Sequence, residues 1–139
     1  MNWILWSLLS AVFAAATAIL AKIGIKDIDS NLATAIRTTV ILVFTWSIAI
    51  STGKHGGLTA IPKRSWIFLC LSGLATGLSW LCYFRALQLG PASAVAPVDK
   101  LSVVLVIIFA ALFLNEALTP MKLAGGLLIA AGAVMLAFA

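Results

Sequence analysis

Charged residues are scarce in this sequence. Only 9% of its 139 residues are Asp, Glu, Lys or Arg, and 63% are hydrophobic, whereas roughly a quarter of a typical soluble domain is charged. This balance excludes a water-soluble globular protein and places the chain in a lipid bilayer. The net charge of +5 comes from dispersed basic residues, which excludes a basic arm that binds nucleic acid.

Groups that carry chemistry are also scarce. His55 is the only histidine, and the two cysteines, Cys70 and Cys82, lie in one apolar segment. On one helix they would be about 18 Å apart along the axis, too far for a disulfide, and no His–Cys metal site can be assembled. The sequence has no Gly-rich phosphate loop, no Ser-His-Asp set and no paired carboxylates. We therefore expect neither an enzyme nor a bound cofactor or metal.

Long apolar runs are abundant. A bilayer core of about 30 Å needs about 20 apolar residues in a helix, and lipid-facing strands must alternate within a closed barrel. We therefore expect an all-α integral membrane protein, a bundle of five transmembrane helices in a single domain over residues 1–139. The first run lacks the basic start of a signal peptide, so we expect it to remain as a span. The expected helices cover residues 3–21, 32–50, 66–89, 92–114 and 121–139.

Basic residues in the short loops predict the orientation, because cytoplasmic loops are enriched in Lys and Arg. The loop between the second and third spans and the turn before the fifth carry most of them, while those on the opposite side lie beside acidic residues. We expect the N-terminus inside and the C-terminus outside. The bias is modest, so insertion in both orientations stays open. The residues expected inside are Lys54, Lys63, Arg64 and Lys122, and those expected outside are Lys22, Lys26, Asp27 and Asp29.

Asp99 and Lys100 interrupt the fourth apolar run. Nine residues of helix after Gly90 rise by about 13 Å, which places Asp99 close to the bilayer midplane. A charge there costs about 2.5–3.5 kcal/mol on insertion scales, and such residues are functional hypotheses by default. Three roles stay open for Asp99: an ion pair with a cation of a neighbouring helix or copy, a gating or substrate-coupled role, and proton transfer. Pro97, one turn before Lys100, predicts a local bend.

Cations outnumber acids in the outer half of the expected bundle. A buried charge requires a partner, and the single aspartate there cannot satisfy four cations, so we hypothesise a substrate with an anionic group, such as a carboxylate or a zwitterion. A polar stripe on the third helix either packs against a neighbour or lines a pathway, with Trp80 and Tyr83 as aromatic walls. The candidate pathway or coupling residues are Asp99, Lys100, Trp80, Tyr83, Arg85 and Arg37, with Lys22 as the fourth cation.

Small residues predict helix contacts. Gly73 and Gly77 form a GxxxG motif on the third helix, and Gly125 and Gly132 lie on one face of the fifth, where close backbone approach is possible. We expect these faces to pack, including against a second copy of the chain. Glu116 follows the fourth span, where it either caps the last helix or pairs with a nearby lysine; Thr119 and Pro120 also have the residue types of a helix start.

The stretch YFRALQLGPASAVAPVDKLSVVLVIIFAALFLNEALTPMKLAGGLLIAAGAVML, residues 83–136, resembles the second part of an EamA domain. The matching features are the aromatic-Arg-Ala-Leu start, Ala-Pro at 96–97, Leu-Asn-Glu before Leu-Thr, and the glycines of the last helix. The resemblance implies the drug/metabolite transporter superfamily, in which most relatives carry two such domains in inverted topology. This chain is similar to the short five-helix bacterial and archaeal branch. It lacks the first-helix glutamate of the four-helix multidrug relatives, so their proton-for-cation mechanism is not carried over.

The resemblance implies a secondary transporter that exports small metabolites or drugs across the bacterial or archaeal cytoplasmic membrane, the cell inner membrane. Because five helices enclose little space, we expect a homodimer that works by alternating access, with an antiparallel pair as one possible form. The expected partners are a small-molecule substrate, the lipid bilayer and a second copy, without nucleic acid. The alternative is a non-transporting membrane subunit, for which the polar stripes would be interfaces.

Overall fold

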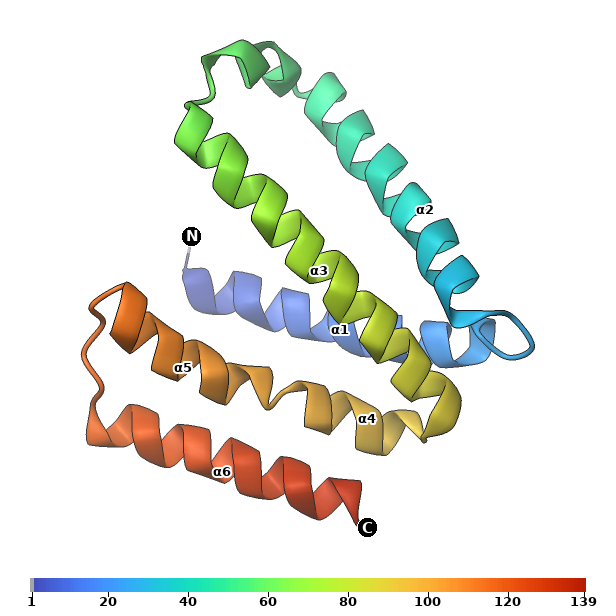
Figure 1. Cartoon of the computed structure of the whole chain (residues 1–139), viewed down its shortest axis with the longest axis vertical. Coiled ribbons are helices and arrows are strands. Elements are labelled where there is room, and N and C mark those ends of the chain that lie inside the picture. The colour runs from blue at the N-terminus through green and yellow to red at the C-terminus, as the bar shows by residue number, and fades with distance from the viewer. Residues whose placement is uncertain (1) are drawn as a thin grey trace. The chain divides into compact units, whose positions relative to one another are not determined.

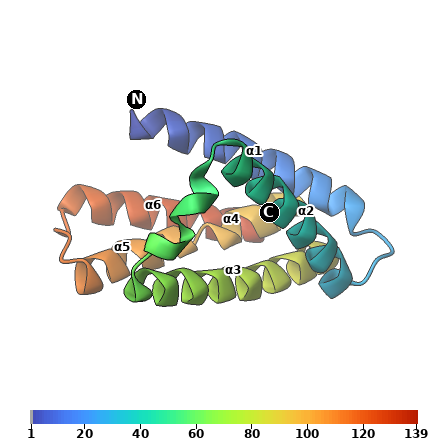
Figure 2. The ribbon, with the colours of Figure 1, turned by 90° about the horizontal axis from the view of Figure 1, so that it is seen from above.

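The computed structural model describes residues 2–139, and all regular elements within them are helical (Figures 1 and 2). This confirms the all-α class. The elements in chain order are α1 (Trp3–Gly24), α2 (Ser30–Ser51), the 3₁₀ helix η1 (Lys54–Ala60), α3 (Lys63–Leu89), α4 (Ala92–Asp99), α5 (Ser102–Phe113) and α6 (Pro120–Ala137).

Five helical segments are long and apolar enough to cross a membrane: α1, α2, α3, α6 and the combined segment Ala92–Phe113. This confirms the five expected spans. Several helices extend past the apolar runs into polar flanks, so α3 begins at Lys63 rather than at residue 66. The start of α2 has a clear physical cause, since Asp29 Oδ1 accepts the backbone N–H groups of Asn31 (2.9 Å) and Leu32 (3.1 Å). An acceptor at this position satisfies N–H groups that have no helical partner.

The fourth span is interrupted, whereas the sequence predicted one helix over residues 92–114. Pro97 has no N–H to donate to the preceding turn, and α4 ends two residues later at Asp99. Across the break the backbone forms tighter turns, in which Lys100 N donates to Pro97 O and Leu101 N to Val98 O, each at 3.0 Å. The bend expected near Pro97 is therefore a change from α-helical to 3₁₀ hydrogen bonding just before α5.

The chain divides into two compact units. The unit Gly24–Gln88 contains α2, η1 and α3, and η1 packs against the end of α2. At its other end, Gln88 Nε2 donates to the carbonyl oxygen of Ile28 at 2.6 Å. This bond links the segment before α2 to the end of α3.

The second unit consists of the residues before and after that segment, and in it α6 runs back along α5 and α4 (Figure 1). Gly126 marks the close approach, because a Cβ built there would lie 3.3 Å from Ile107 Cδ1. Lys22 Nζ donates to the carbonyl oxygen of Gly90 at 2.8 Å. The end of α1 is thereby linked to the segment that leads into α4.

Few side chains are buried within the chain itself. In the most apolar stretch of each span, between 0 and 11% of the residues are buried. The apolar faces of these helices are therefore exposed, as expected for surfaces that lipid or another membrane helix covers. The buried hydrophobic residues are Ala18, Ile25, Phe84, Leu87 and Ala133.

Candidate functional site

Arg37 makes the most unusual contact of the unit Gly24–Gln88. It is the eighth residue of α2, and its guanidinium carbon is 4.5 Å from the ring centre of Trp80 and 5.3 Å from that of Phe84. Trp80 and Phe84 are four residues apart on α3, so both rings lie on one helix face. The negative faces of aromatic rings attract a guanidinium, and more strongly where water is excluded. The two rings thus hold the cation within a membrane-spanning segment.

No carboxylate neutralises Arg37 within the described part of the chain. The ion pairs among residues 2–139 join Lys100 to Asp99 and Lys122 to Glu116. Between residues 30 and 98 the sequence has no acidic residue at all. Aromatic rings stabilise a guanidinium without accepting its five in-plane N–H donors. Arg37 can therefore still bind an anionic group.

A groove of about 400 Å³ lies between α2 and α3, and Arg37 is not among the residues that line it. The hydroxyls of Thr38 and Thr39 donate within their own helix, to the carbonyl oxygens of Thr34 (2.8 Å) and Ala35 (3.0 Å). Their oxygen lone pairs remain available, so these hydroxyls present acceptors to a ligand. The residues that line the groove are Asn31, Thr34, Ala35, Thr38, Thr39, Leu42, Gly77 and Leu81.

Asp99 and Lys100 lie in the other unit, at the break between α4 and α5. The Lys100 amine is 3.3 Å from Asp99 Oδ2, and the two side chains are 57% and 35% exposed. Within the described chain, the cation that pairs with Asp99 is therefore Lys100, the next residue in the sequence. The pair lies within the span Ala92–Phe113, where the surface that this chain leaves exposed would meet lipid or another helix rather than water. Charged residues in such a segment are candidates for a functional role.

The remaining predicted pathway residues also belong to α3. Arg85 is exposed and donates to Gln88 Oε1 at 3.0 Å, while Tyr83 is half-buried. The pathway residues thus form two groups: Arg37, Trp80, Tyr83 and Arg85 in the unit Gly24–Gln88, and Asp99 with Lys100 in the other. Sequence reasoning left Phe84 out of the site, although its spacing of four residues from Trp80 was a usable signal.

The predicted packing residues have open surroundings in the described chain. A Cβ built at Gly73, Gly77, Gly125 or Gly132 would meet nothing within 4 Å. The surroundings of Gly73, Gly125 and Gly132 are therefore open, whereas Gly77 lines the groove between α2 and α3. The use of these faces in a dimer stays a prediction. The glycine that does approach a neighbouring helix is Gly126.

The role expected for Glu116 as a cap falls to another residue. The hydroxyl of Thr119 accepts the backbone N–H of Lys122 at 3.2 Å and thereby caps α6. Glu116 Oε2 instead pairs with the Lys122 amine at 3.3 Å, which is the other role considered for it. Among residues 2–139 no cluster of three or more His, Cys, Asp or Glu side chains is arranged to hold a metal ion.

Comparison with known proteins identifies the family of the chain. The sequence pattern of the EamA-like transporter family matches residues 1–138. A Sinorhizobium sp. protein described as "Uncharacterized transporter in cobO 3'region" is 56% identical over 136 residues, which cover 98% of this chain and 96% of the relative. No solved structure matches the chain.

Proposed function

Because the chain belongs to the EamA-like transporter family, we propose that it exports small metabolites or drugs across the cytoplasmic membrane as a secondary transporter. The family and the five spans make it a multi-pass membrane protein. The family, together with the description of the relative as a transporter, supports a transporter role rather than an enzymatic one. The export direction, the dimer and the alternating-access cycle are the proposed parts.

The observation that carries the proposal is the Arg37 guanidinium, which lies over Trp80 and Phe84 without a carboxylate partner. A charged side chain within the bilayer is energetically costly, and such residues normally belong to a substrate or ion pathway. Arg37 would bind an anionic group of the substrate. The N–H fork of a guanidinium matches a planar carboxylate, so a carboxylate or a zwitterion suits this cation.

Two further features support movement and pairing. The break at Asp99 and Lys100 resembles the discontinuous helices that transporters use near the midplane, and we assign these residues to gating or coupling. The exposed helix faces with small residues suit a second copy. In the proposed dimer, with each N-terminus inside or with the copies inserted in opposite orientations, one bundle rocks against the other around the substrate.

The test is export from proteoliposomes loaded with matched compounds: a carboxylate, its neutral amide and a lipophilic cation of similar size. We expect the carboxylate to leave faster than the amide and much faster than the cation. Liposomes without protein provide the leak rate of each compound. A clear preference for the lipophilic cation would overturn the anionic site, and the absence of protein-dependent flux across a broad panel would favour the membrane-subunit alternative.

A further inference from the structure

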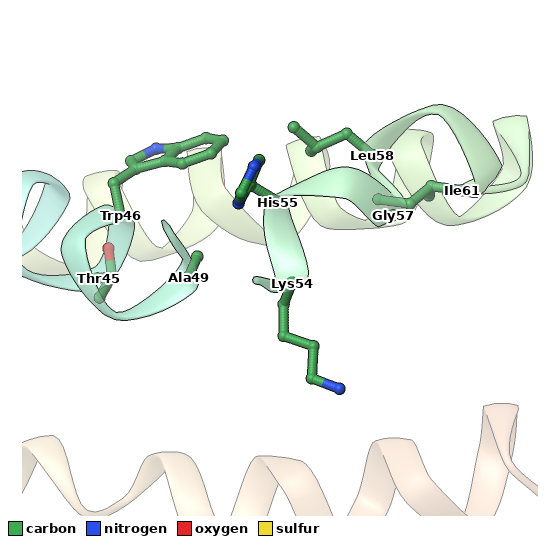
Figure 3. A pocket seen from close by; sticks show the side chains of 8 residues that line it. All are labelled: Thr45, Trp46, Ala49, Lys54, His55, Gly57, Leu58 and Ile61. Atoms are coloured by element: carbon green, nitrogen blue, oxygen red, sulfur yellow. The ribbon is translucent and has the colours of Figure 1, made fainter. Parts of the chain in front are cut away.

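A second hollow of about 470 Å³ lies at the opposite end of α2, remote in sequence from Arg37 (Figure 3). Its walls come from the last turns of α2 and from η1. Figure 3 shows the His55 ring turned toward the indole of Trp46, while the Lys54 side chain extends away from both. The volume falls within the roughly 300–1,000 Å³ typical of small-ligand sites. The residues that line the hollow are Thr45, Trp46, Ala49, Lys54, His55, Gly57, Leu58 and Ile61.

The hollow lies where the chain leaves the hydrocarbon region. Trp46 is five residues before the last residue of α2, or about 8 Å along the helix axis. The helix η1 then joins two membrane spans and presents Leu58, an exposed leucine, in the same wall. Tryptophan favours the membrane interface, where its ring meets acyl chains and its N–H meets polar groups. A ligand in this hollow would therefore contact both the acyl-chain and the headgroup regions.

The electrostatic character of this end is entirely basic. Lys54, Lys63 and Arg64 lie within eleven residues, and no acidic residue occurs between positions 30 and 98. Lys54 forms neither of the ion pairs found among residues 2–139. Basic groups next to a membrane span attract anionic headgroups, with about 1 kcal/mol for each Lys or Arg. Charge complementarity therefore favours an anionic ligand.

We propose that the hollow between α2 and η1 binds one anionic glycerophospholipid. The phosphate oxygens accept a hydrogen bond from an N–H of His55, which carries a donor in either protonation state. The Lys54 amine donates to them once its flexible side chain turns back from the orientation in Figure 3. The acyl chain lies along Trp46, Leu58 and Ile61. A free phosphate would leave this apolar wall uncovered, and a zwitterionic lipid would bring its choline cation next to the basic residues. This lipid site is independent of the substrate and of the direction of transport.

Two matched pairs of variants test the proposal on the full-length chain. Gly57→Leu places a side chain in the hollow, whereas Gly56→Leu changes the adjacent glycine, which does not line it; a Cβ at either position meets nothing within 4 Å. Lys54→Gln removes a cation that lines the hollow, and Lys63→Gln removes one outside it. Each variant is purified from mixed phosphatidylglycerol and phosphatidylcholine. Native mass spectrometry then counts the lipids retained per chain.

We expect the wild-type protein to retain one phosphatidylglycerol in preference to phosphatidylcholine. Gly57→Leu should abolish this preference and Gly56→Leu should keep it. Lys54→Gln should weaken retention about fivefold, the factor for one lysine at an anionic surface, while Lys63→Gln changes it less. Equal losses within each pair, or no preference in the wild type, would overturn the site. Displacement by millimolar inorganic phosphate would also overturn it, because the ligand would then be an anion rather than a lipid.

The charge pair and the glycine pair give independent results, so the failure of one variant to fold does not block the test. Elution as a single species in gel filtration identifies folded variants. Quenching of Trp46 by brominated lipid adds a second readout in a variant whose other tryptophans are phenylalanine. Brominated phosphatidylglycerol should quench it more than brominated phosphatidylcholine at the same fraction, and equal quenching would contradict a bound anionic lipid.

Discussion

Replacing Arg37 by glutamine tests the α2–α3 site most directly. The guanidinium is half-buried and lies 4.5 Å from the ring centre of Trp80 and 5.3 Å from that of Phe84. Glutamine keeps part of the stem and two N–H donors but removes the charge and the planar fork. Because no acidic side chain pairs with Arg37 in the described chain, the substitution leaves no carboxylate without its partner. The loss should therefore appear in substrate recognition.

The magnitude follows from the bond that is lost. A hydrogen bond to a charged group contributes about 1.5–3 kcal/mol, which corresponds to roughly 10- to 150-fold in affinity. Arg37→Gln should raise the KM for a carboxylate substrate by this factor and leave the KM for its amide within about threefold. Arg37→Lys keeps the charge but loses the fork and the stacking geometry, so its effect on the carboxylate should be intermediate.

The assay is initial-rate export from proteoliposomes, with the acid and the amide measured over a range of internal concentrations. Arg64→Gln is the matched control: its guanidinium also lies over a ring, at 5.8 Å from Phe68, but it is exposed on the first turn of α3. We expect Arg64→Gln to change neither KM. Equal losses for acid and amide in Arg37→Gln, or the same discrimination loss in both variants, would refute an anion-binding role.

Three further predictions concern the break, the helix contact and the orientation. Asp99→Asn should slow transport without a comparable loss in the free energy of unfolding, because Asp99 is assigned to gating or coupling; denaturant unfolding in detergent measures the second quantity, and a large loss of stability with unchanged transport by the folded fraction would mean a structural role. Gly126→Leu should lower that free energy by about 1–3 kcal/mol through overlap with Ile107, whereas Gly125→Leu, with open space around it, should change it little. A single cysteine at Gly56, in a chain otherwise free of cysteine, should react with an impermeant reagent from outside in about half of the molecules if both orientations occur, and in almost none if the N-terminus is always inside.

The helices were predictable because hydrophobic run length alone determines which segments can cross a bilayer. The break in the fourth span was only partly predictable. Pro97 predicted a bend, but the interruption depends on which backbone N–H groups around Lys100 form 3₁₀ hydrogen bonds. A run of apolar residues carries no information about that choice. The cap of α6 had two candidates within four residues, and hydrogen-bond geometry selected Thr119 over Glu116.

The candidate site was predictable residue by residue but not as an arrangement. The sequence indicated Arg37 and Trp80 separately, as an intramembrane cation and an aromatic wall. Their contact depends on which faces of α2 and α3 meet, and helical periodicity does not specify the pairing of two helices. Phe84 was left out of the predicted site for the same reason. An aromatic residue on an apolar helix usually packs against a neighbour, and only the structure shows that a cation lies over this ring. The pairing of Asp99 with Lys100 likewise depends on side-chain conformations at the break between α4 and α5, which the sequence does not specify.

One charge imbalance underlies both proposed sites, and their depths make them separable. Residues 30–98 carry five basic and no acidic side chains, so anions are attracted at both ends of α2. Arg37 lies within a span, where only a ligand that enters the bundle reaches it, while Lys54 lies on a connector in reach of lipid headgroups. Arg37→Gln should therefore alter discrimination between acid and amide without changing the retained phosphatidylglycerol, and Lys54→Gln should do the reverse. If either variant changed both readouts equally, one diffuse basic field rather than two sites would account for the imbalance.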